Sequence, residues 1–170
     1  MLSLISMLFL IFGVAFSAKA QGDCESVYDA DNKLIATDHR AFSTHSAAIH
    51  GGNPETSESV MVGGITYVKV KGVWRKSPIT VAELREQKAE NRKNAKNVSC
   101  RYLRDESVDG EAARVFSVHS ETEDGKYDLT VSISKSRGLP VRQEEDINTG
   151  DKMHYSIRYE YTNVFAPSAQ

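Results

Sequence analysis

Five histidines are the residues of this sequence best suited to hold a metal ion, and they are His39, His45, His50, His119 and His154. Zinc sites place their ligands at short, regular spacings, for example two histidines one helical turn apart. No two of the histidines have that spacing, and His39 and His45 lie too far apart along one expected strand to share an ion. We therefore predict ordinary surface or core histidines, with no metal and no cofactor.

The acidic run at residues 144–146 could supply paired carboxylates for glycoside chemistry. Neighbours along a strand point to opposite faces, so Glu144 and Asp146 would form the pair, and Gln143 and Glu145 would face away. The alternative, which we favour, is a solvated strand whose charges oppose aggregation. The sequence also lacks the Gly-x-Ser-x-Gly motif of a serine hydrolase. We predict that the protein is not an enzyme.

The only two cysteines are Cys24 and Cys100, and Cys24 follows closely on an apolar N-terminal segment. Cys24 could carry a lipid, but lipidation requires a small residue directly before the cysteine, and Asp23 stands there. An even number of cysteines in an exported chain indicates a disulfide. Two free buried thiols are the alternative. We predict a Cys24–Cys100 disulfide.

The apolar segment at residues 2–16 is shorter than the roughly 20 residues that a membrane-spanning helix needs. Small residues at Ala18 and Ala20 are typical of a signal-peptidase site. We expect residues 1–20 to be a cleaved signal peptide and residues 21–170 to form a single domain without an integral membrane anchor. An uncleaved anchor is the alternative.

The net charge of −2 shows no basic excess. A protein that binds nucleic acid needs a concentrated basic face. We therefore expect no nucleic-acid partner.

Periodicity predicts an α+β fold built on a curved antiparallel β-sheet. A first helix is expected at residues 23–36, capped by Asp23, and a weak strand follows at 39–45. Gly63-Gly64 predicts a hairpin between strands 57–62 and 65–70, and a short strand is expected at 73–75. The Gly-rich and Pro-containing stretch at 51–54 is expected to be a turn.

A capping box at Thr80 and Glu83 predicts a second helix that runs to about residue 96. Its apolar positions are few, so it should lie loosely on the surface. Turn residues then separate five expected strands, which consecutive hairpins would arrange as an antiparallel meander. These strands are expected at residues 98–107, 111–121, 126–134, 139–147 and 153–164.

Two of these strands carry apolar side chains along one face only. Leu129, Val131 and Ile133 share a face of one strand, and Tyr155, Ile157 and Tyr159 share a face of the last. A strongly twisted sheet of this size must curl around something or expose an apolar concavity. Side chains of the first helix, or a ligand, could fill that concavity.

Three segments together resemble the LolA/LppX-like superfamily of periplasmic lipoprotein carriers and lipid-binding proteins. They are residues 65–74, which end in Gly72-Val73-Trp74, residues 136–142 with Gly138-Leu139-Pro140, and the aromatic strand at 159–164. The resemblance implies a half-open β-barrel covered by an N-terminal helix and a mid-chain helix. It also implies a periplasmic protein that carries a lipid or lipoprotein without a cofactor.

On this resemblance we expect an apolar cavity that binds a hydrophobic or acylated ligand, with a lipoprotein as one candidate, in a monomeric protein. The expected lining is Leu129, Val131, Ile133, Tyr155, Ile157 and Tyr159. Trp74 is expected either at the mouth of the cavity or as a plain hairpin residue. Val81 and Leu84 would face the cavity from the lid helix. The alternative function is a non-lipid scaffolding or binding protein of the cell envelope with a closed core.

Overall fold

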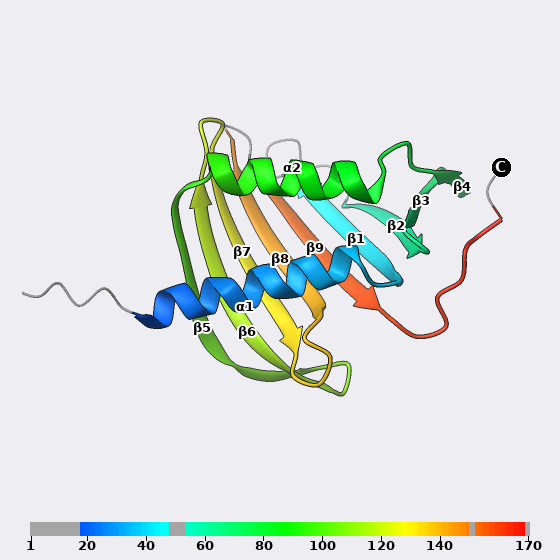
Figure 1. Ribbon diagram of the computed structural model, residues 1–170. Helices are drawn as coiled ribbons and strands as arrows, with labels where there is room; N and C mark the ends of the chain where they lie inside the picture. The colour runs from blue at the N-terminus through cyan, green and yellow to red at the C-terminus, as the bar shows by residue number, and fades with distance from the viewer. Residues whose placement is uncertain (1–17, 48–53, 150–151, 169–170) are drawn as a thin grey trace, which may run out of the picture.

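A computed structural model of the protein describes residues 18–47, 54–149 and 152–168. Two helices lie on one face of a nine-stranded sheet in this part of the chain (Figure 1). The helices are α1 (Ala18–Ile35) and α2 (Val81–Asn94). The strands are β1 (His39–Ala47), β2 (Glu55–Val62), β3 (Ile65–Val70), β4 (Val73–Lys76), β5 (Lys96–Val108), β6 (Glu111–Glu121), β7 (Lys126–Ser134), β8 (Pro140–Asn148) and β9 (Lys152–Glu160).

The sheet is antiparallel throughout, with the strand order β4-β3-β2-β1-β9-β8-β7-β6-β5. Every neighbouring pair except one is consecutive along the chain. The exception joins β1 to β9, with Arg40 opposite Glu160 and Ala47 opposite Met153. Strands β4 and β5 do not pair with each other, so the curved sheet stays open. The predicted α+β fold with a half-open barrel is confirmed.

The expected hairpins are present because their turn residues accept the left-handed backbone conformation. Gly63 and Gly64 have φ of 57° and 74° between β2 and β3, as a two-residue hairpin turn requires. Lys71 and Gly72 have φ of 50° and 81° between β3 and β4. The turn expected at residues 51–54 lies almost entirely outside the described residues.

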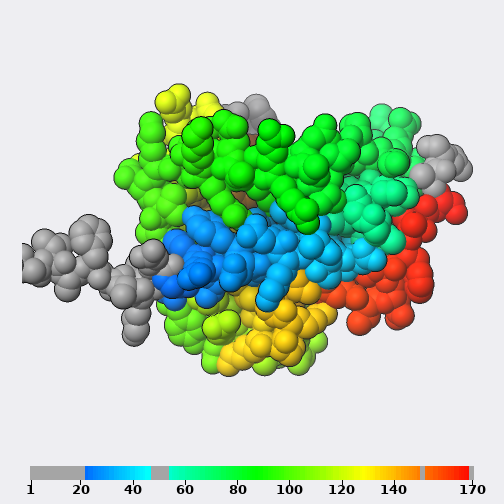
Figure 2. Space-filling view, viewed as in Figure 1, coloured from blue at the N-terminus to red at the C-terminus, as the bar shows by residue number. Residues whose placement is uncertain are grey.

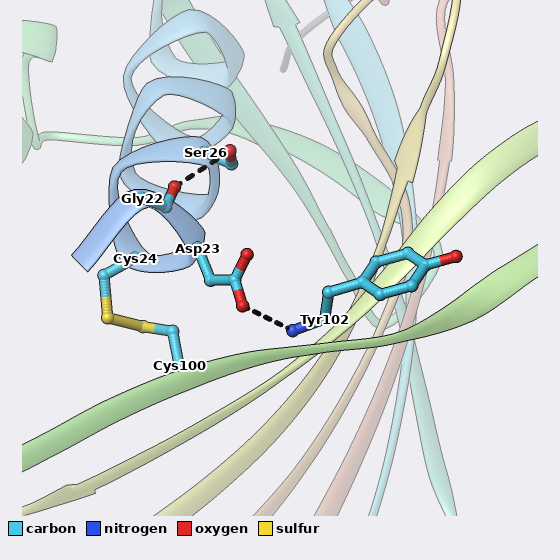
Figure 3. The surroundings of a disulfide bond; sticks show 6 residues. All are labelled: Gly22, Asp23, Cys24, Ser26, Cys100 and Tyr102. Carbon is cyan, nitrogen blue, oxygen red and sulfur yellow. Dashed lines mark hydrogen bonds between the residues drawn. A yellow bond between two sulfur atoms is a disulfide. The ribbon is translucent and has the colours of Figure 1, made fainter. Parts of the chain in front are cut away.

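Helix α1 begins earlier than predicted, at Ala18 rather than at Asp23. The residues before Asp23 include alanine, lysine and glutamine, which favour helix and extend it upstream. Asp23 therefore lies within the helix and does not cap it. Its Oδ2 accepts a hydrogen bond from the backbone N–H of Tyr102 at 2.9 Å (Figure 3). The predicted start of the helix was wrong.

The last strand is shorter than predicted and ends at Glu160, not at residue 164. Its pairing with β1 stops at Arg40, so residues beyond Glu160 have no strand to pair with. Phe165 lies beyond the strand and is 71% exposed.

The main core lies between α1 and the sheet. Val27 and Ala30 of the helix pack against Phe116, Val131 and Ile133 of β6 and β7. We call the face of the sheet that carries both helices the concave face, and the opposite side the outer face. The predicted disulfide is confirmed: Cys24 is bonded to Cys100 and fixes the start of α1 to the edge strand β5 (Figure 3).

Candidate ligand-binding site

Helix α1 covers part of the surface that was expected to line a cavity. Val131 and Ile133 are only 1% and 2% exposed because the side chains of Val27 and Ala30 pack on them. Leu129, one step further along β7, packs at the margin of this cluster and is only partly buried. The concave face is therefore closed beneath α1 and becomes accessible beyond Leu129.

The three expected residues of β9 lie on the same concave face and are half-buried. The strand register places Tyr155 beside Glu145, Ile157 beside Gln143, and Tyr159 beside Ala41. The hydroxyl of Tyr159 donates a hydrogen bond to Gln143 Oε1 at 2.6 Å. Burial raises the pKa of Tyr159 far above its usual value, so this hydroxyl keeps its proton. The accessible part of the concave face thus combines aromatic and aliphatic side chains with a few polar groups.

Trp74 lies apart from these residues, on the short edge strand β4. It pairs with Lys69, whose ammonium lies 5.5 Å from the centre of the indole ring. Lys69 in turn bonds Glu58, which lies opposite Phe42 in the neighbouring pair of strands. The register of these strands places Trp74 on the outer face, away from the helices.

Helix α2 lies over the concave face without a single buried residue. Its N-terminus has the predicted capping box, in which Thr80 and Glu83 bond each other's backbone N–H groups. Val81 and Leu84 are half-buried, and Val81 lies close to Gly64 of the β2–β3 turn. With so little apolar burial, packing against the sheet contributes little to holding α2 in place.

Polar contacts with α1 hold the C-terminal half of α2. Lys88 Nζ lies 2.5 Å from Asp31 Oδ1, and Arg92 Nη2 lies 2.9 Å from Asp31 Oδ2. The Arg92 guanidinium also stacks 4.5 Å from the centre of the Tyr28 ring. Asp31 thus joins two cations of α2, Lys88 and Arg92, to α1.

A hollow opens between the two helices toward the C-terminal end of α2 (Figure 2). A separate cavity of about 680 Å³ lies between the C-terminal end of α2, the β6–β7 turn and the sheet. A groove of about 330 Å³ runs between α1 and α2, lined by residues that include Arg85, Lys88 and Arg92. The open space on this side of the molecule is therefore largely lined by polar groups.

Glu145, which was not among the predicted site residues, lies in the larger of these cavities. It stands between Leu129 and Tyr155 in the strand register, so its side chain lies on the concave face. Burial raises the pKa of its carboxyl, and the nearby charge of Lys88 opposes that shift. The alternation along residues 143–146 places Glu145 and Glu144 on different faces of the sheet. Only the pairing of Glu145 with Leu129 shows that Glu145 is the one on the side of the helices.

The outer face carries two histidines that are each bonded to an aspartate, and one of these pairs, His119 with Asp128, lines a depression of about 1060 Å³. His119 Nδ1 lies 2.7 Å from Asp128 Oδ1, and His154 Nδ1 lies 2.8 Å from Asp146 Oδ1. These hydrogen bonds to carboxylates raise the pKa of both histidines. In the described part of the chain, no group of three or more His, Cys, Asp or Glu residues is arranged to hold a metal ion.

The other histidines are dispersed. His39 is buried, which lowers its pKa, and its ring meets that of Tyr159 edge-on at 5.7 Å. His45 stacks on Tyr155 with ring centres 5.6 Å apart. His50 lies outside the described residues.

Comparison with known proteins gives a likeness of structure only. No protein-family model matches the sequence, and no curated protein matches it either. The lipoprotein LppX of Mycobacterium tuberculosis superposes with a TM-score of 0.52 at 12% identity, over 86% of this chain and 97% of LppX. LprF of Mycobacterium bovis gives 0.50 at 10% identity, over 88% of this chain and 98% of LprF. The chain shares the fold of LppX and LprF.

Within the described residues, neither helix has the length and apolarity that a membrane crossing requires. The half-open sheet with helices on its concave side, expected from the resemblance, is present. Its two faces differ in chemistry: the concave face carries apolar side chains beneath the helices, and the outer face carries histidine–aspartate pairs.

Proposed function

We propose that this protein binds the acyl chain of a lipid or lipoprotein on the accessible part of its concave face, beneath α2, without catalysis. The observation that carries the proposal is the contrast between the two helices. Helix α1 packs on the sheet through Val27 and Ala30 and is covalently bonded to β5 through the Cys24 disulfide. Helix α2 has no buried residue, although half-buried Leu129, Tyr155 and Ile157 lie on the face that it spans.

An acyl chain would gain about 0.8 kcal/mol for each CH₂ group that leaves water. A helix held by a few polar contacts can move aside at small cost, because locally unstable segments open independently of the rest of a fold. We propose α2 as this movable cover and Val81 and Leu84 as its contacts with the ligand. The resemblance of the sequence to lipid-binding proteins, together with the fold shared with the lipoprotein LppX, supports this proposal.

We also propose that the protein acts as a monomer in the periplasm, after cleavage of residues 1–20. The resemblance of the sequence to periplasmic carriers supports this location, and the confirmed disulfide supports an oxidising compartment.

A fluorescent fatty-acid probe tests the binding function. Ile157→Glu places a charge on the accessible concave surface, where an unpaired charge is unfavourable next to an acyl chain. We expect this variant to bind the probe roughly tenfold or more weakly than the unmodified protein. The matched control is Thr44→Glu, which adds the same charge on the outer face of the adjacent strand β1, opposite Ser156.

Circular dichroism should show that both variants are folded. Failure of the folded, unmodified protein to bind any acyl probe would contradict the proposal. The alternative function, a non-lipid binding protein of the cell envelope with a closed core, would then be favoured, since α1 already closes part of the concave face.

A further inference from the structure

We infer that the cavity beneath the C-terminal end of α2 binds an ammonium group of the ligand, with the Glu145 carboxylate as its counter-ion. This inference rests on the proposed function, because it assigns the polar head of the ligand whose acyl chain the concave face would hold. The cavity of about 680 Å³ is large enough for such a group.

Glu145 is a carboxylate that lacks a partner of its own. Among the described residues, no side chain or backbone N–H donates a hydrogen bond to it. The charge of Lys88 acts on Glu145, but its ammonium is bonded at 2.5 Å to Asp31. Burial removes part of the hydration of the Glu145 carboxylate, and a bound cation would replace that lost stabilisation.

The other walls of the cavity also favour a cation. The last turn of α2 ends there at Asn94, and its free carbonyl groups carry partial negative charge. Glu123 and Asp124 line the cavity from the β6–β7 turn, and Tyr127 contributes an aromatic ring that can contact a cation.

Two lysines line the same cavity and set its charge balance. Lys96 lies 3.7 Å from Glu123 and partly neutralises it, while Lys93 lies on the last turn of α2. Three carboxylates thus face two ammonium groups, and an additional cation brings the lining to neutrality. An anionic ligand would instead increase the excess of negative charge.

The position of Glu145 links the cavity to the acyl-binding surface. Leu129 and Tyr155 stand on either side of Glu145 in the strand register. A ligand whose ammonium group contacts Glu145 therefore has its chain beside the apolar residues of β7 and β9. A primary ammonium suits the site well, since it offers three hydrogen-bond donors to carboxylate and carbonyl oxygens. An aminolipid, or a free amine, could supply that group.

Isothermal titration calorimetry with three ligands of equal chain length tests the inference: octylammonium, octanol and octanoate. The unmodified protein should bind octylammonium most tightly. Glu145→Gln keeps the shape of the side chain and removes its charge, and should weaken octylammonium binding roughly tenfold or more while leaving octanol binding unchanged. The control is Glu144→Gln on the same strand, whose side chain lies on the outer face with Ser156 and should leave all three affinities unchanged.

Equal affinity for the three ligands, or no effect of Glu145→Gln, would overturn the ammonium site and leave acyl binding intact. Binding of octylammonium alone, lost in Glu145→Gln, would support the ammonium site and contradict the proposed acyl function. No binding of any ligand would overturn both. Ethanolamine distinguishes the sources of the ammonium group: affinity equal to that of octylammonium indicates a free amine, and much weaker affinity indicates an amphiphile.

Discussion

Asp128 and Asp146 stand directly opposite each other on β7 and β8, on the outer face of the sheet. Like charges in that position destabilise a sheet. Each aspartate is bonded to its own histidine, His119 or His154, and His154 also lies 3.1 Å from Glu144. A protonated histidine on each side therefore offsets the repulsion between the two carboxylates.

This arrangement predicts that both histidines titrate above their usual pKa in an NMR titration. Their contribution to stability should be complete below the unfolded-state pKa of about 6.5 and should be lost as pH rises through the higher folded-state pKa. The melting temperature should therefore fall as pH rises from about 6 to 8, as far as these groups determine it.

Asp128→Asn isolates one of the two pairs. It should lower the pKa of His119, since the hydrogen bond to Asp128 is the largest cause of the upward shift. The pKa of His154 should change much less because its own partners, Asp146 and Glu144, remain. An unchanged pKa of His119 in this variant would refute the pairing.

At the scale of elements, Asp31 is the contact on which the position of α2 depends. Asp31→Asn removes the charge that binds both Lys88 and Arg92, each a half-exposed ion pair that contributes up to about 1 kcal/mol. We expect amide hydrogen exchange in residues 81–94 to become several-fold faster, with little change in melting temperature.

The control for this experiment is Asp29→Asn on the exposed side of the same helix. It removes the same charge from α1 and should leave exchange in α2 unchanged. Exchange that rises equally in both variants would show that α2 responds to the charge of α1 in general and is not held by Asp31.

The elements themselves were largely predictable from the sequence because their signals are local. Strands β6 and β7 have the predicted bounds, and the Gly63-Gly64 turn and the Thr80 capping box are where the sequence placed them. Contacts between distant segments were not predictable. The alternation on β7 puts Val131 and Ile133 on one face, but it cannot show that α1 covers them and leaves Leu129 at the margin.

The candidate site was less predictable than the fold for the same reason. Trp74 could be assigned to a short strand, but its face depends on a chain of pairings through Lys69 and Glu58. Glu145 belongs to an acidic run that looks uniformly solvated in the sequence. Only the pairing of β8 with β7 and the position of α2 place it in a cavity.

For the whole molecule, the proposed export predicts a defined N-terminus. Protein purified from a bacterial periplasm should begin at Gln21 and carry no acyl group on Cys24, because Cys24 is bonded to Cys100. The expected cleavage point lies within the first turn of α1, and residues 1–17 lie outside the described part of the chain. Intact-mass measurement under non-reducing conditions decides this, and a mass that includes residues 1–20 would contradict it.

The pairing of β1 with β9 also governs when this protein can fold during its synthesis. The first strand meets its central partner only after residues 152–160 have left the ribosome and, in an exported chain, the translocation channel. Until then β1–β4 and β5–β8 are two separate antiparallel units with no strand between them. The sheet therefore cannot be completed until nearly the whole chain is available. If the protein is exported, as proposed, the chain can pass through a secretion pore before the complete sheet forms.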